Sequence, residues 1–283
     1  MLSKVDLHMH TTASDGTFTP DELLALIRES GIRVFACTDH DTVAGALTLG
    51  EMPMADVRFI PGVEFSCRSA AGKCHILGYG MDCRNCALTD ALDEGKKLRE
   101  EKLAKRLAFL RTAFGIWLSE EELNWLRSQT SPGKPHIGYL LMNRGLAASI
   151  SEAIKIYLEP LKDGDDRLPS ETAVKAILAA GGIPVWAHPL GGEGEKRLTG
   201  EEFRDQLRVL LREGIRGLEC RYSRYTKEET EFLTETAREN GLLISGGSDF
   251  HGRNKPDIRP GQLSAEGIIC PEEELTVLNH LIG

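Results

Sequence analysis

A repeated order of short apolar run, polar loop and amphipathic segment constrains the fold of this chain most strongly. The apolar runs cover residues 4–7, 34–37, 57–63, 75–79, 183–187, 215–219 and 242–245. Helical patterns follow several of them, at residues 19–30, 170–180, 199–212 and 227–240. This alternation predicts a mostly parallel sheet, and about seven such units in one domain favour a barrel over an open sheet.

Local capping signals support the helix boundaries. Thr19 and Pro20 suit the N-cap and first turn of a helix that Gly31 ends. Ser170 is the expected N-cap of the helix that follows residue 169, and a terminal helix is expected near residues 271–281.

Residues 85–169 interrupt the rhythm. They contain helical patterns at 90–114, 119–128 and 149–158 and little that resembles a strand. We therefore predict three parts: a first barrel part at 1–84, a helical insertion at 85–169 that contributes substrate contacts, and a second barrel part at 170–283. The basic residues of stretch 96–111 are better interpreted as a solvated helix face than as a surface that steers anions.

Charge and apolar content exclude several classes of protein. The net charge of −9 argues against a protein that coats a nucleic-acid backbone, so we expect no stable duplex DNA binding. No apolar run suits a signal peptide or a membrane span, and the seven cysteines are scattered. These features predict a cytoplasmic protein that does not bind membranes. Cys83 and Cys86 form a C-x-x-C without a second pair, which disfavours a zinc or redox site.

Histidines and acidic residues gather at or just after the predicted strand ends, or on a strand itself. Because active sites of parallel barrels lie at the C-terminal ends of their strands, the fold would bring these residues together. The candidate metal ligands are His8, His10, Asp15, His40, Glu64, His75, His188, Asp249 and His251.

Six imidazoles and three carboxylates exceed what one ion can use, so two or three divalent ions are expected. Mixed nitrogen and oxygen ligands suit Mn, Fe or Zn better than Ca or Mg. Closely spaced divalent metals activate water and stabilise a phosphoryl group during in-line attack. The pattern therefore predicts phosphoester hydrolysis.

Six ordered motifs resemble those of the polymerase and histidinol phosphatase (PHP) family. They are Asp6-Leu7-His8-Met9-His10 with Ser14-Asp15-Gly16, Thr38-Asp39-His40-Asp41, Gly62-Val63-Glu64, His75-Ile76-Leu77-Gly78, Ala187-His188-Pro189 and Gly247-Ser248-Asp249-Phe250-His251. The resemblance implies a distorted seven-stranded (β/α)7 barrel with a trinuclear metal centre, manganese being the first expectation and zinc or iron the alternatives.

The resemblance also implies how the ligands divide. His8, His10, Glu64 and Asp249 would hold one ion and form the catalytic set. Glu64, as a bridge, would hold a second ion with His75 and His188. The third ion would bind Asp15, His40 and His251.

Within the family the chain is most similar to a bacterial branch with a helical insertion. That branch includes a 3′,5′-nucleotide bisphosphate phosphatase and a 5′–3′ exoribonuclease. Its Arg-x-His motif corresponds to Lys134-Pro135-His136, in which lysine lacks the planar fork of arginine. The candidate substrate-binding residues are Lys134, His136 and Arg221, with Tyr222 and Arg224 beside Arg221. An ordinary solvated loop would explain Arg221, Tyr222 and Arg224 nearly as well.

Three functions compete on these grounds. The first is a phosphatase that removes the 3′-phosphate of 3′,5′-bisphosphonucleotides, and the second is an exoribonuclease acting on short RNA or RNA 5′ ends. The expected partner is thus a small phosphorylated nucleotide or a short RNA end. A non-catalytic PHP module that supports a partner protein is the third, and the nine intact ligands speak against it. Histidinol phosphate is a further substrate that the insertion disfavours.

Overall fold

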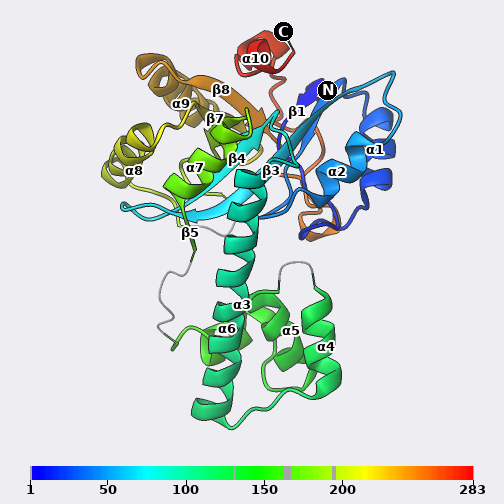
Figure 1. Cartoon of the computed structure of the whole chain (residues 1–283), viewed down its shortest axis with the longest axis vertical. Coiled ribbons are helices and arrows are strands. Elements are labelled where there is room, and N and C mark those ends of the chain that lie inside the picture. The colour runs from blue at the N-terminus through cyan, green and yellow to red at the C-terminus, as the bar shows by residue number, and fades with distance from the viewer. Residues whose placement is uncertain (1, 130–131, 162–166, 193–195, 283) are drawn as a thin grey trace. The chain divides into compact units, whose positions relative to one another are not determined.

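The computed structural model describes residues 2–129, 132–161, 167–192 and 196–282. The chain forms two compact units (Figure 1). Unit 1 consists of Met1–Leu92 and Leu168–Gly283, and unit 2 consists of Asp93–Arg167.

Unit 1 is built on one sheet that nearly closes into a barrel. Its hydrogen-bonded order is β1 (Val5–Asp6), β2 (Val34–Cys37), β3 (Arg58–Arg68), β4 (Lys73–Tyr79), β6 (Ile183–Trp186), β7 (Gly217–Tyr222) and β8 (Leu243–Gly247). The amide of Leu7 donates to the carbonyl of Gly246 at 3.2 Å, and Met9 bridges to Phe250, so the first and last strands also meet. The predicted seven-stranded α/β barrel is confirmed.

One strand of the barrel runs against the others. β4 is antiparallel to both of its neighbours, β3 and β6, whereas the other neighbouring strands are parallel. His75 therefore lies near the start of β4, opposite Ser66 in the C-terminal half of β3. Reversal of this strand places His75 at the same end of the barrel as residues that follow the parallel strands.

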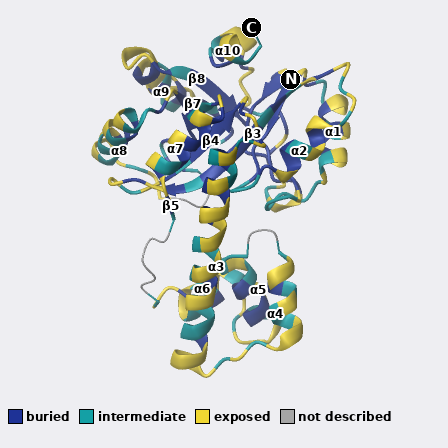
Figure 2. Ribbon diagram, viewed as in Figure 1, coloured by how far each residue is buried: buried dark blue, intermediate teal, exposed yellow. Residues whose placement is uncertain are grey.

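Helices cover the outside of the sheet (Figure 1). They are α1 (Pro20–Glu29), α2 (Ala44–Gly50), α7 (Ser170–Ala179), α8 (Gly200–Glu213), α9 (Lys227–Glu239) and the short α10 (Leu278–Leu281). Thr19, Thr199 and Thr226 each form a capping box that starts a helix. The strands are mostly buried while the helices expose their outer faces (Figure 2), so the apolar side chains of both form one core.

Unit 2 is entirely helical in its described part. It contains most of α3 (Cys86–Phe114) together with α4 (Glu120–Ser128), α5 (Lys134–Asn143) and α6 (Ile150–Tyr157). Leu110, Leu126, Ile137, Leu141 and Ala153 are buried in its own apolar core. The pattern did not predict α5, whose N-cap is Gly133 and whose first turn contains Pro135.

Four local expectations need correction. Pro169, not Ser170, is the N-cap of α7, and the Ser170 hydroxyl instead donates to Glu213 at 2.6 Å. A two-residue strand, β5 (Leu168–Pro169), pairs with β3 in a region where little strand was expected. α2 was not anticipated.

The predicted terminal helix at 271–281 is likewise broken. It consists of a 3₁₀ turn at Glu272–Glu274 and the short α10. The Thr276 hydroxyl accepts from the Ile244 amide, and the Val277 amide donates to the Ile244 carbonyl. These bonds to β8 take residues 276 and 277 out of a continuous helix. In the described part of the chain, no helix has the length and apolar character needed to cross a bilayer.

Candidate metal centre

All nine predicted ligands lie together at one end of the barrel. His8 and His10 follow β1, His40 follows β2, Glu64 lies within β3, and His75 lies on β4. The remaining four come from loops: Asp15 from the loop after β1, His188 from the end of β6, and Asp249 and His251 from the end of β8. Contacts between side chains link every member of this set.

Glu64 lies at the centre of the cluster and uses both oxygens. Its Oε2 lies 3.1 Å from His8 Nε2, 3.3 Å from His10 Nε2 and 3.1 Å from His40 Nδ1. Its Oε1 lies 3.0 Å from both His75 Nδ1 and His188 Nε2. A carboxylate that faces two sets of imidazoles has the geometry of a bridging ligand.

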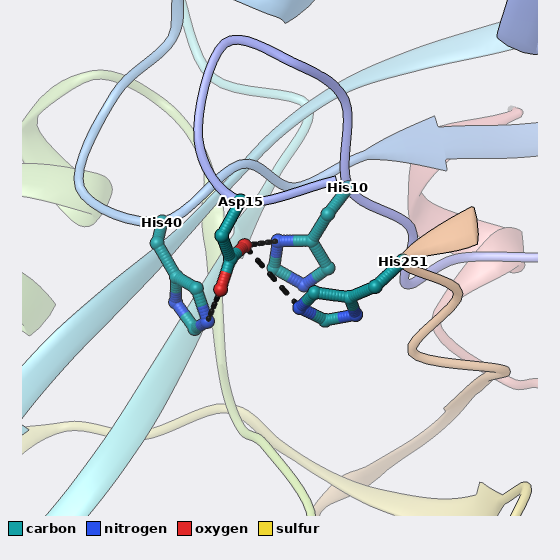
Figure 3. A group of neighbouring side chains, drawn as sticks. All are labelled: His10, Asp15, His40 and His251. Carbon is teal, nitrogen blue, oxygen red and sulfur yellow. Dashed lines mark ion pairs between the residues drawn. The ribbon is translucent and has the colours of Figure 1, made fainter. Parts of the chain in front are cut away.

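Asp15 forms a second focus, shown in Figure 3. Its carboxylate lies 3.3 Å from His251 Nε2, 3.7 Å from His10 Nδ1 and 3.9 Å from His40 Nε2. The rings of His10 and His251 stack with centroids 4.0 Å apart. His10 and His40 thus lie between the groups around Asp15 and Glu64.

Three groups could each hold an ion, because the donor atoms within each lie within 4.8 Å of one another. They are His8, His10, Glu64 and Asp249; His40, Glu64 and His75; and His10, Asp15, His40 and His251. The resemblance gave His40 to the third ion alone, whereas the geometry makes it available to two. His188 approaches the second group through its 3.0 Å contact with Glu64.

The chemistry of the donors fits divalent metal ions. His8 Nε2, His10 Nε2, His40 Nδ1 and Glu64 Oε2 are buried and make no hydrogen bond within the described structure. Buried polar atoms without a hydrogen bond are costly unless another group satisfies them. Imidazole nitrogens and carboxylate oxygens are the donors that Mn, Fe and Zn accept in proteins.

The charges of the cluster shift its acids and bases in opposite directions. Burial raises the pKa of Glu64, but the rings of His40, His8 and His75 outweigh it and hold the pKa well below its usual value. Burial likewise opposes the low pKa of Asp249, which Lys255 and His251 produce. His8 shows the reverse: burial lowers its pKa, but the carboxylates of Glu219, Glu64 and Asp249 raise it well above 6.5.

The backbone is held in unusual conformations at the centre. His188 has φ +27° and Asp249 has φ +58°, a region that residues other than glycine rarely adopt. A Cβ at Gly247 would lie 2.2 Å from the Cβ of His8, and a Cβ at Gly16 would lie 2.4 Å from the carbonyl oxygen of His10. Glycine at these positions allows the ligand loops to approach closely.

The sequence patterns missed several residues that hold the ligands. Glu219, buried within β7, contacts His8 and the backbone of His188. Asp39 accepts from Thr11 and Ser14 in the loop that carries Asp15. Both Glu219 and Asp39 are acidic residues at a predicted strand end, and this was the signal by which the sequence could have identified them.

Asp249 also has partners that the patterns missed. Its Oδ2 accepts from the Tyr222 hydroxyl at 3.0 Å and pairs with the Lys255 ammonium. The sequence suggests Tyr222 only as a substrate contact, and it gives no signal for Lys255. Both lack the acidic or imidazole character that marked the nine candidates.

The predicted substrate residues have varied surroundings. Arg221 pairs with Glu274 near the C-terminus, and its role as a substrate contact stays a prediction. Arg224 pairs with Asp257. Lys134 begins α5 in unit 2, where His136 Nδ1 accepts from the Gly133 amide at 3.1 Å.

The C-x-x-C cysteines have different environments. Cys83 is buried, Cys86 is exposed at the start of α3, and both are free thiols. The structure thus shows no disulfide between them.

Barrel and cluster together define a metal-dependent hydrolase. No family model matches the chain. The chain is 32% identical over 256 residues to a 5′–3′ exoribonuclease of Haemophilus influenzae, covering 89% of this chain and 91% of that protein. It is 28% identical over 257 residues to a 3′,5′-nucleoside bisphosphate phosphatase of Chromobacterium violaceum, covering 88% of each. The chain belongs to the PHP family of metal-dependent phosphoesterases, and the resemblance is confirmed.

A solved structure shows the same fold. It is described as an amidohydrolase of Chromobacterium violaceum with bound sulfate and no metal. Its TM-score is 0.80 at 24% identity, and the match covers 99% of this chain and 96% of that chain. The barrel and the helical insertion therefore recur together in another protein.

Proposed function

We propose that this phosphoesterase removes the 3′-phosphate of 3′,5′-bisphosphonucleotides, using two or three divalent ions with manganese as the first expectation. The observation that carries the proposal is the convergence of nine nitrogen and oxygen ligands on Glu64 and Asp15, with four buried donor atoms that lack hydrogen bonds within the described structure. A module without catalysis has no need for this arrangement. Zinc and iron are the alternative metals.

The distribution of charge supports a small substrate. Residues 93–167 contain thirteen Lys and Arg against twelve Asp and Glu, so the rest of the chain, with 21 against 31, carries a net charge of −10. An acidic barrel unit repels an extended RNA backbone. The few phosphates of a nucleotide can instead be neutralised locally by bound cations and by Lys134, which we propose as a substrate contact from the insertion.

Each residue has a proposed part in hydrolysis. When bound, divalent cations supply Lewis-acid catalysis for phosphate-ester cleavage. His8, His10, Glu64 and Asp249 would hold one ion, and Glu64 with His40, His75 and His188 would hold a second. Asp15, His10, His40 and His251 would hold a third. The low pKa of Glu64 and Asp249 keeps both carboxylates ionised and able to bind a cation at neutral pH.

The surrounding residues orient this set. Tyr222 and Lys255 occupy Oδ2 of Asp249, which leaves Oδ1 facing His8 and His10 at 3.6 and 3.3 Å. Asp39 fixes the loop of Asp15 through Thr11 and Ser14. The donor atoms are thereby held in place by the protein itself.

The similarity to the Haemophilus influenzae exoribonuclease favours a second candidate function. In that case the same centre would cleave nucleotides from the 5′ end of short RNA, with the basic stretch 96–111 as a guide. This function would need contacts beyond the first nucleotide, and unit 2 carries thirteen of the 34 Lys and Arg of the chain.

A product assay separates the two candidates. Adenosine 3′,5′-bisphosphate and a 5′-phosphorylated oligoribonucleotide are incubated separately with the protein and Mn²⁺. Orthophosphate release from the first substrate is expected, whereas mononucleotide release from the second at comparable efficiency would favour the exoribonuclease. A chelator should stop either reaction and added Mn²⁺ should restore it. Activity that persists with chelator would contradict the proposed metal centre.

A further inference from the structure

Glu219 is a buried carboxylate that serves two ligands at once. It lies within β7, is fully buried, and uses its two oxygens for different partners. Oε1 lies 2.8 Å from His8 Nδ1, and Oε2 accepts from the backbone amide of His188 at 2.7 Å. Both oxygens are therefore occupied by groups that belong to proposed ligands, and Glu219 is not itself in any of the three ligand groups.

The contact with His8 orients its ring. A proton on Nδ1 directed at Glu219 leaves the lone pair on Nε2, which is the nitrogen that faces Glu64 Oε2 at 3.1 Å and Asp249 Oδ1 at 3.6 Å. A carboxylate behind an imidazole fixes its tautomer and raises its basicity toward a metal. Glu219 occupies this position for His8.

The contact with His188 acts through the backbone. His188 has φ +27°, and its Nε2 lies 3.0 Å from Glu64 Oε1. A hydrogen bond from an amide to a carboxylate is stronger than one to a neutral acceptor. Glu219 therefore holds the His188 amide at a backbone position that few residues adopt freely.

We infer that Glu219 is a positioning residue that couples the two ion sites joined by Glu64. His8 belongs to the first proposed site and His188 approaches the second, so one carboxylate behind both fixes them together. This inference rests on the proposed metal centre, and it predicts that loss of Glu219 weakens both sites although neither loses a ligand.

The main test measures Mn²⁺ affinity by calorimetry on the full chain, wild type against Glu219→Gln. The substitution keeps size but places an amide group against one of two hydrogen-bond donors. We expect the dissociation constant for Mn²⁺ to rise about 10- to 100-fold, the range found for residues behind metal ligands. Wild-type affinity in folded Glu219→Gln would overturn the inference.

Two backgrounds test whether Glu219 acts on both sites. In His188→Ala the carboxylate can act only through His8, and in His8→Ala only through the backbone of His188. Glu219→Gln should weaken Mn²⁺ binding further in each background. Absence of this effect in either background would refute the coupling, because Glu219 would then serve one ligand alone.

Tyr79→Phe is the matched control. Tyr79 is also fully buried in unit 1, and its hydroxyl accepts from Ser245 at 3.2 Å. This variant should lose folding stability while keeping wild-type affinity for Mn²⁺. If Tyr79→Phe lost as much Mn²⁺ affinity as Glu219→Gln, general destabilisation would explain both variants, and the inference would be overturned.

If Glu219→Gln fails to fold, Glu219→Asp is measured instead. It keeps the charge but is too short to span both partners, so the same weakening is expected, and unchanged affinity would overturn the inference. Wild-type protein that binds no Mn²⁺ would instead contradict the proposed metal centre itself.

Discussion

Glu64 Oε1 and His188 Nε2 lie 3.0 Å apart although 124 residues separate them in the chain. The opposite oxygen of the same carboxylate faces His8, His10 and His40. One acidic side chain thus contacts histidines from both parts of the barrel, which precede and follow the helical insertion in the sequence.

Glu64→Gln should abolish metal-dependent hydrolysis. The neutral amide cannot bridge two cations, because its NH₂ group offers no lone pair to a cation. We expect phosphate release to fall by more than about 100-fold, beyond the loss typical of residues behind metal ligands. Orthophosphate release and Mn²⁺ calorimetry measure the change. Glu51→Gln, at an exposed carboxylate, is the control, and an active Glu64→Gln would refute the role of Glu64.

The metal-free protein should lose stability as pH rises above about 6.5. The folded-state pKa of His8 is raised well above 6.5, so its protonated form contributes stability that is fully present below 6.5 and lost through the raised pKa. Added Mn²⁺ should remove this loss because the cation replaces the proton beside Glu64 and Asp249.

Urea unfolding across this pH interval, with chelator and with Mn²⁺, measures the effect. His8→Asn should show a smaller dependence than the wild type with chelator. A metal-free protein whose stability rises with pH through the interval would contradict the expectation.

Gly247→Ala should destabilise the barrel where it closes. The new Cβ would lie 2.2 Å from the Cβ of His8 and 2.4 Å from its amide nitrogen, so β1 and β8 must separate. Overpacking of this kind costs about 1–3 kcal/mol or more. We expect a lower unfolding midpoint and weaker Mn²⁺ binding. Gly50→Ala is the control because a Cβ there meets nothing within 4 Å, and equal stability of both variants would show that the barrel adapts at no cost.

Lys134→Ala should raise KM for a bisphosphonucleotide with little change in kcat. A lost contact between an ammonium and a phosphate weakens binding by about tenfold for each 1.4 kcal/mol. Arg221→Ala should leave KM unchanged, since that guanidinium pairs with Glu274. Steady-state kinetics distinguish them, and a KM increase confined to Arg221→Ala would reverse the assignment.

The sequence by itself determined the barrel and its nine candidate ligands. Short continuous apolar runs alternate with capped helical patterns, and these local signals require no knowledge of distant contacts. Residues such as His8, His40 and His188 stood out because polar side chains that follow buried strands meet at one end of a parallel barrel. Divalent metal chemistry followed from the mixture of imidazoles and carboxylates.

Only the tertiary structure decided how these ligands divide and what holds them. The reversal of β4, which brings His75 beside Glu64, depends on pairing between strands and leaves no mark in local propensity. Glu219 resembles any acidic residue at a strand end until β7 places it behind His8 and His188. Arg221 matched a phosphate contact by type, and the tertiary structure places its guanidinium beside Glu274, 53 residues further along the chain. Side-chain partners depend on contacts between distant segments, and such contacts are fixed only when the barrel closes.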